Sequence, residues 1–114
     1  MGIKDDAGEV LIYYYNVYTD ETSENRIIGP KEILEITKWK PVRVSNAVKY
    51  LDDLSALKIE NYSGNIDGVP HFRILGMDTL GIHMIEDEKT FKETFGFQIG
   101  VPGVFQFSWG LSEK

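Results

Sequence analysis

The chain has 114 residues, 42% of them hydrophobic and none of them cysteine, and its formal net charge is -6. A chain of this length supports one compact core, so we expect a single domain over residues 1–114. The lack of cysteine excludes disulfide bonds, thiolate metal sites and a cysteine nucleophile. The apolar runs are too short to span a bilayer and the first residues lack the pattern of a signal peptide, which predicts a soluble cytoplasmic protein with no membrane partner.

The first expected element is a helix over about residues 5 to 19, because apolar residues recur there at helical spacing from Ala7 to Tyr18. Ile12, Tyr13 and Tyr15 lie off this stripe. A helix that is apolar on nearly all sides usually has more than one neighbour covering it. One side of this helix is expected to pack against the helices that follow it. The other side is expected to pack against either the C-terminal segment or a second subunit.

A helix-turn-helix is expected next. Ile27 and Ile28 predict a short extended segment, and Gly29-Pro30 predicts the start of a helix over about residues 30 to 37. After a break, apolar residues from Val44 to Leu57 recur every three or four positions, which predicts a helix at about residues 42–56. The outward side of this helix carries Arg43, Ser45, Asn46, Lys49, Tyr50 and Asp53.

A ribbon and two short helices should follow. Residues 58–62 and 70–75 predict two strands, and the segment between them is rich in turn-forming residues. Asp78 is expected to cap a fourth helix. The pair Asp87-Glu88 suits the N-terminus of a further short helix that buries Phe91 and Phe95.

The C-terminal segment predicts a second hairpin. Residues 97–101 alternate, Val101-Pro102-Gly103-Val104 suits a type II turn, and Phe105, Phe107 and Trp109 alternate on the return. An isolated two-stranded hairpin is marginally stable in water. The three aromatic residues therefore need a covering surface, and the spare side of the first helix is the expected one.

The charge is unevenly distributed along the chain. Residues 31–58 hold six basic and four acidic residues, a net charge of +2, whereas the remaining residues hold six basic and fourteen acidic ones, a net charge of -8. The net-positive block coincides with the helix-turn-helix. A local surface that faces nucleic acid on an otherwise repulsive body would have this distribution.

The order of these elements resembles the winged-helix (winged helix-turn-helix) superfamily of small archaeal and bacterial transcription regulators. Residues 32–36 are similar to its supporting helix, residues 44–51 to its recognition helix, residues 57–60 to the entry into its wing, and residues 74–82 to the passage from wing to helix. The resemblance implies an α+β fold with a three-helix core and a β-hairpin wing over residues 7–88. Residues 89–111 would add a C-terminal helix and hairpin.

The resemblance also implies a DNA-binding transcription regulator that reads duplex DNA with the helix at 42–56. The expected base contacts are Arg43, Ser45, Asn46, Lys49 and Tyr50, and the expected phosphate contacts are Lys31, Lys38, Lys40 and Arg73. The excess apolar surface predicts a homodimer, which would double the modest positive patch. Its predicted interface contains Tyr13, Tyr15, Phe105, Phe107 and Trp109.

Two alternatives remain open at the level of sequence. The first is a winged-helix protein–protein interaction module that does not bind DNA, because residues 61–69 contain Asp67 but no Lys or Arg and because the remaining surface is acidic. The second adds a small apolar effector between the first helix and the C-terminal hairpin. The four basic residues Lys38, Lys40, Arg43 and Lys49 could also form an ordinary solvated face. Trp39 is expected to be a packing residue.

Neither catalysis nor a cofactor is expected. The sequence contains no phosphate-binding loop, zinc-protease or nucleophile-elbow motif. His71 and His83 lack the spacing and the carboxylate neighbours of a metal site, so no metal is predicted.

Overall fold

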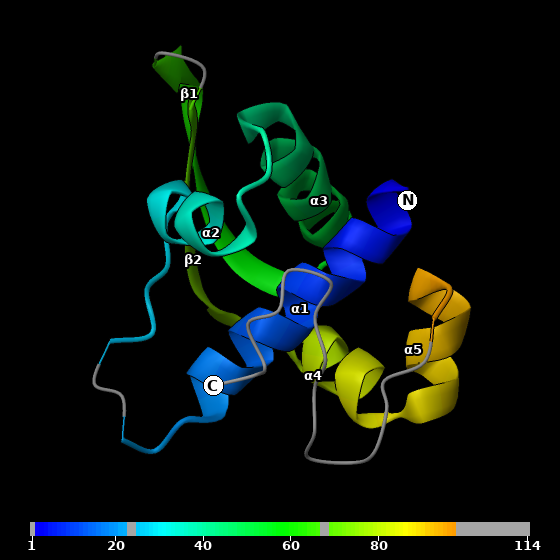
Figure 1. Ribbon diagram of the computed structural model, residues 1–114. Helices are drawn as coiled ribbons and strands as arrows, with labels where there is room; N and C mark the ends of the chain where they lie inside the picture. Colours follow the sequence, from blue (N-terminus) through cyan, green and yellow to red (C-terminus); the bar gives the residue numbers. More distant parts are fainter. Residues whose placement is uncertain (1, 23–24, 67–68, 98–114) are drawn as a thin grey trace.

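The computed structural model describes residues 2–22, 25–66 and 69–97 (Figure 1). These residues form five helices and a two-stranded antiparallel sheet, which confirms the predicted α+β class. The elements in chain order are α1 (Ile3–Thr19), α2 (Pro30–Thr37), α3 (Pro41–Asp53), β1 (Leu57–Ile66), β2 (Val69–Met77), α4 (Thr79–Glu86) and α5 (Glu88–Phe95). Within this part of the chain, no helix has both the length and the apolar character needed to cross a membrane. The predicted C-terminal hairpin lies outside the described residues.

Helix α1 is the centre of the core and is buried on more than one side. Val10, Leu11, Ile12 and Tyr14 are each at most 1% exposed, although Ile12 lies off the predicted apolar stripe. Helix α3 packs against α1 from above in Figure 1, and α4 and α5 also contact α1. The predicted double cover of this helix is therefore confirmed, and two helices of the same chain supply part of the second cover.

The connection between α1 and α2 is fastened to α1 by hydrogen bonds at Arg26. The Tyr14 hydroxyl donates to the backbone carbonyl of Arg26 at 2.6 Å, and Arg26 Nε donates to the carbonyl of Tyr18 at 2.7 Å. Burial raises the pKa of Tyr14 to about 12. The phenol therefore stays protonated, and able to donate this hydrogen bond, throughout the physiological pH range. The connection is thereby directed back toward the sheet.

Strands β1 and β2 form a long antiparallel ribbon that projects from the helices (Figure 1). Both strands are longer than the predicted 58–62 and 70–75, because pairing resumes near the tip with Ile66 opposite Val69. Ile28 adds a bridge to Ile74 of β2 through backbone hydrogen bonds of 3.1 and 2.8 Å. The extended segment predicted at Ile27-Ile28 is confirmed at this bridge.

Helix α3 ends at Asp53, three residues before the predicted end of the 42–56 helix. Ser55 has a φ of 58°, in the left-handed region, and this residue turns the chain out of the helix. Leu57 is 3% exposed, as its place in the apolar pattern predicts, but it enters the core from β1. The spacing of apolar residues continued past the helix end because the first residue of the strand faces the same core.

Helices α4 and α5 close the described part of the core. A Cβ atom on Gly81 would lie 1.9 Å from the carbonyl oxygen of Ala56, so only glycine permits α4 to approach the α3–β1 connection this closely. The Asp87 side chain accepts hydrogen bonds from the backbone N–H groups of Lys89 and Thr90 at the start of α5, which confirms the helix start predicted there. Asp78 precedes α4 as predicted but makes no side-chain capping bond.

Candidate nucleic-acid interface

The unit formed by α2, a turn and α3 is fixed by caps and by a proline. Gly29 is the N-cap of α2, and its N–H donates to Glu32 Oε1 at 3.0 Å. At the other end of α2, Lys38 adopts a left-handed conformation with a φ of 61°. Pro41 then begins α3, where a missing N–H costs little. Three residues therefore separate the two helices, a turn length typical of a helix-turn-helix.

One line of side chains along α3 points away from the protein, and we call it the exposed stripe. It consists of Val42, Asn46, Lys49 and Asp53. Spacings of four, three and four residues place them on one side of the helix. Val42 is 64% exposed and the Lys49 side chain is 75% exposed. The opposite side of α3 is buried and carries Val44, Ala47, Val48 and Leu51.

The five predicted base contacts are divided by this arrangement. Asn46 and Lys49 lie in the exposed stripe, and Ser45 is half-buried beside it. Tyr50 is half-buried and packs against the core. The Lys49 Nζ lies 3.6 Å from Asp53 Oδ1, and both side chains are largely exposed. Such a surface ion pair is weak and leaves the lysine able to change partner.

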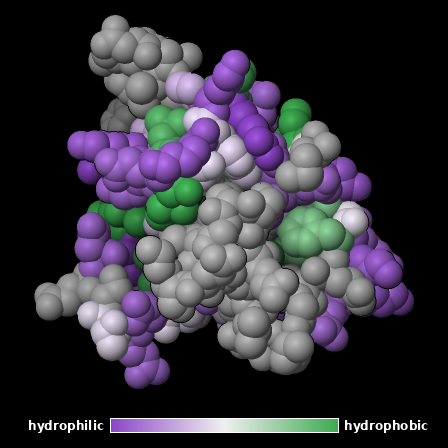
Figure 2. All heavy atoms as spheres, in the orientation of Figure 1, coloured by the Kyte–Doolittle hydropathy of each residue, from purple (hydrophilic) through white to green (hydrophobic). Residues whose placement is uncertain are grey.

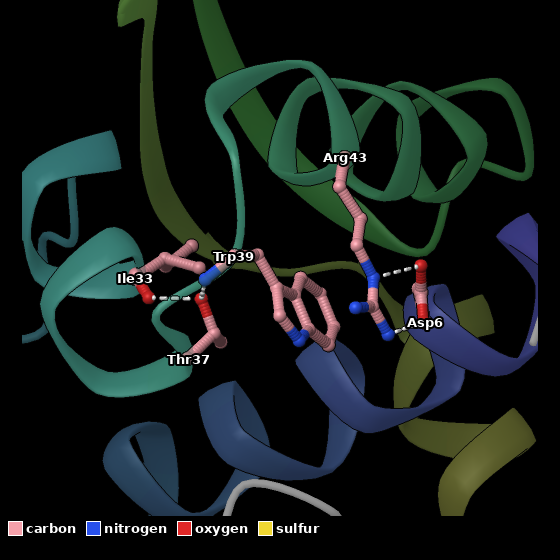
Figure 3. Close-up of polar contacts among 5 residues, drawn as sticks. All are labelled: Asp6, Ile33, Thr37, Trp39 and Arg43. Atoms are coloured by element: carbon pink, nitrogen blue, oxygen red, sulfur yellow. Dashed lines mark hydrogen bonds and ion pairs between the residues drawn. The ribbon is translucent and has the colours of Figure 1, made fainter.

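Arg43, the fifth predicted base contact, faces α1 instead of the solvent side of α3 (Figure 3). Its Nε and Nη2 atoms donate to the two carboxylate oxygens of Asp6 at 2.8 and 2.9 Å. The guanidinium also lies over the Trp39 ring, 4.1 Å from the ring centroid. The hydrogen bonds from Arg43 to Asp6 raise the pKa of Arg43, and Glu9 adds to the effect. Arg43 is thus engaged within the chain and ties α3 to α1.

Thr37 holds the turn so that Trp39 meets Arg43. Its buried hydroxyl donates to the carbonyl oxygen of Ile33 at 2.8 Å and accepts from the N–H of Trp39 at 3.1 Å (Figure 3). Trp39 packs against the core, which confirms the packing role predicted for it. Neither Asp6 nor Thr37 stands out as a site residue in the sequence. Asp6 lies 37 residues from Arg43, and no local pattern connects the two.

Three of the predicted phosphate contacts lie on α2 and in the turn. Lys31, Lys38 and Lys40 are all exposed. Among the residues that the structure describes, none of the three has a carboxylate partner. Their ammonium groups can therefore neutralise an external anion without breaking an internal pair.

The fourth predicted phosphate contact, Arg73, lies on the ribbon. Its Nη2 atom is 2.9 Å from Glu60 Oε1 on the paired strand, and both side chains are about half exposed. A cross-strand pair of opposite charges stabilises the ribbon modestly. Arg73 is therefore held along the ribbon by its pairing with Glu60.

A surface hollow of about 420 Å³ lies between the start of α1 and the start of α3. Its lining consists of Gly2, Ile3, Asp6, Val42, Arg43 and Asn46. The Arg43–Asp6 pair lies at the lining, and the exposed stripe begins there. The first turn of α3 is consequently accessible from outside on the side that faces α1.

The residues predicted for a dimer interface are only partly described. Tyr13 and Tyr15 are half-buried and pack against the core of the same chain. The Tyr15 hydroxyl donates to Glu86 Oε2 on α4 at 2.6 Å, and this bond raises the pKa of Tyr15. Phe105, Phe107 and Trp109 lie outside the described residues. Part of the apolar surface that suggested a dimer is thus covered within the chain.

Known proteins offer no guide to the candidate interface. Neither the family models, nor the curated proteins, nor the solved structures include a significant match to this chain.

Proposed function

We propose that this protein is a transcription regulator that binds duplex DNA through α3, in a winged-helix arrangement. The observation that carries the proposal is the exposed stripe of α3, which follows directly after a short turn with two exposed lysines. In a helix-turn-helix, the second helix enters the major groove and its first turns contact base edges. The ribbon of β1 and β2 would serve as the wing.

Different side chains would have different tasks on the DNA. Asn46, which is exposed on α3, has the amide geometry that reads adenine, and Lys49 and Ser45 are close enough on the helix to contact bases or phosphates. Lys31, Lys38 and Lys40 would contact phosphates and fix the register. Arg43 and Tyr50 would support α3 from inside the protein, since Arg43 is bound to Asp6 and Tyr50 packs on the core.

We further propose that two copies bind together. Three exposed lysines give one chain only a few phosphate contacts, and phosphate neutralisation supplies most nonspecific affinity. A two-fold dimer would present two such surfaces to half-sites about 34 Å apart. The interface would use surfaces other than the parts of α1 that α3, α4 and α5 cover.

A protein-interaction module is the competing function, and one observation favours it. Three of the cations predicted to contact DNA are paired with carboxylates of the same chain: Arg43 with Asp6, Lys49 with Asp53, and Arg73 with Glu60. An interaction module would use the exposed stripe to contact a protein, and it would have little affinity for a polyanion.

The test is fluorescence anisotropy with a labelled duplex of random sequence, measured at several salt concentrations. We expect binding that weakens steeply as salt rises, because counterions are released when phosphates are neutralised. The double change Lys38→Ala and Lys40→Ala should make the slope of log K against log salt shallower by about two for each bound chain.

The matched control is the double change Lys89→Ala and Lys92→Ala. It removes the same charge from the exposed side of α5, a helix that packs on α4 and α1. If both double variants lost the same DNA affinity, the binding would depend on net charge alone. No binding of the wild-type protein at low salt would favour the interaction module.

A further inference from the structure

Val42 is an unusual residue for the place it occupies. It is 64% exposed, more than any other large hydrophobic residue whose exposure the structure describes. It follows Pro41 in the first turn of α3 and is β-branched, a class with somewhat lower helix propensity. Neither burial nor helix formation therefore explains a valine at this position.

Most neighbours of Val42 are polar or charged, and Ile3 is the apolar exception in the lining of the surface hollow. Asn46 lies one helical turn further along the exposed stripe, and the two residues share the lining of the surface hollow. Lys40 precedes the helix, and Lys49 follows on the same side. In Figure 2, hydrophilic side chains cover much of the described surface and hydrophobic ones form separate patches. Val42 is thus a small exposed apolar group that lies beside an amide, with a lysine before it and another after it in the sequence.

Arg43 does not compete for the same position. Its guanidinium is held by Asp6 and by the Trp39 ring, on the side of α3 that faces α1. The first turns of α3 therefore present a pair of methyl groups and, next to them, a primary amide. These two groups match the major-groove edge of an A·T pair, which offers the thymine 5-methyl group and the adenine N6 and N7 atoms.

We infer that Val42 is a specificity-determining residue that contacts a thymine 5-methyl group while Asn46 binds adenine on the same or the adjacent base pair. This inference rests on the proposed DNA-binding function. Residues four apart on a helix have Cβ atoms about 5–6 Å apart, and successive bases on one strand are about 3.4 Å apart along the axis. The preferred half-site then contains an A·T step under the start of α3.

A partner protein could also use an exposed valine, and Ile3 would help it. Ile3 is 47% exposed and lines the same hollow. The two occupants differ in their chemistry, because a protein would be held by Val42 and Ile3 together, whereas a base edge would depend on Val42 and Asn46. The lysines on both sides of Val42 favour the base edge.

The test starts by selecting preferred duplexes from a random pool with the wild-type protein. Each thymine of the selected half-site is then replaced in turn by uracil, which removes only the 5-methyl group. One replacement should weaken binding about fourfold, the effect of one buried methyl group. In Val42→Ala the same replacement should have little effect. Replacing the neighbouring adenine by 7-deazaadenine should weaken binding about tenfold in the wild type but not in Asn46→Ala.

The control variant is Ile3→Ala, which should retain the full response to uracil. Because the modified bases leave the protein unchanged, a folding defect cannot imitate the expected pattern. A uracil response that persists in Val42→Ala would overturn the inference, as would salt-dependent binding with no preference for A·T pairs, and both leave the proposed function standing. Absence of binding to every duplex would overturn the proposed function and the inference together.

Discussion

Two residues other than glycine hold a left-handed backbone conformation in the described part of the chain. Lys38 ends α2 with a φ of 61°, and Ser55 follows α3 with a φ of 58°. Glycine is the usual residue at such helix ends because a Cβ atom disfavours this conformation. A lysine at the first of these positions retains an exposed charge in the turn at a cost in stability.

Replacing these residues by glycine should separate stability from DNA binding. We expect Lys38→Gly and Ser55→Gly each to raise the free energy of unfolding by about 0.5–1 kcal/mol, since both remove the left-handed strain. Urea denaturation measures this change. Only Lys38→Gly should also reduce the salt dependence of DNA binding, by about one unit of slope. Equal DNA binding by both variants would remove Lys38 from the interface.

At the scale of elements, an ion pair joins α1 and α3 beside their apolar contact. Asp6 is 5% exposed and accepts two hydrogen bonds from Arg43, whose guanidinium lies over Trp39. A nearly buried carboxylate is costly unless it is paired. The pair therefore favours one placement of α3 on α1, and with it one orientation of the exposed stripe.

Breaking this pair should destabilise the protein in a non-additive way. We expect Asp6→Ala and Arg43→Ala each to lower the free energy of unfolding by about 1–3 kcal/mol, because each leaves a charged partner unsatisfied. The loss of stability in the double variant should be about 1 kcal/mol smaller than the sum of the two single losses. Asp5→Ala removes a neighbouring acidic residue from the same helical turn and should change stability much less. Additive losses in the double variant would mean that the pair contributes no coupling energy.

The elements themselves were largely predictable from the sequence, because each depends on local patterns. Gly29-Pro30 marked the start of α2, and the apolar spacing marked α1 and most of α3. The engagement of Arg43 by Asp6 was not predictable, since it joins residues 37 positions apart and depends on how two helices pack. The covering of α1 by α4 and α5 was missed for the same reason. The sequence identified exposed polar residues on α3 but not which of them turn back toward the protein.

At the scale of the whole molecule, the acidic charge must be reconciled with the polyanionic partner that we propose. The chain carries a net charge of -6, and Asp53 lies at the end of the exposed stripe, 3.6 Å from the Lys49 ammonium group. This aspartate would oppose the proposed DNA binding in two ways, because it would repel phosphates and because it would compete with them for Lys49. An acidic surface that weakens nonspecific binding would leave more of the affinity to base contacts.

Removing the charge of Asp53 should therefore strengthen binding to duplex DNA. We expect Asp53→Asn to raise the affinity for random duplex about two- to tenfold and to steepen the salt slope by about one unit, since Lys49 becomes available to a phosphate. The free energy of unfolding should change by less than about 0.5 kcal/mol, because exposed ion pairs contribute little.

Glu93→Gln is the matched control for this change. It removes one negative charge from an exposed position on α5, a helix that packs on α4 and α1. A larger gain in DNA affinity for Asp53→Asn than for Glu93→Gln would place the DNA along α3. Salt screens distant charges, so only a charge near the DNA changes the affinity strongly. Equal gains would show that the molecule responds only to its net charge, and α3 would then have no special position on the DNA.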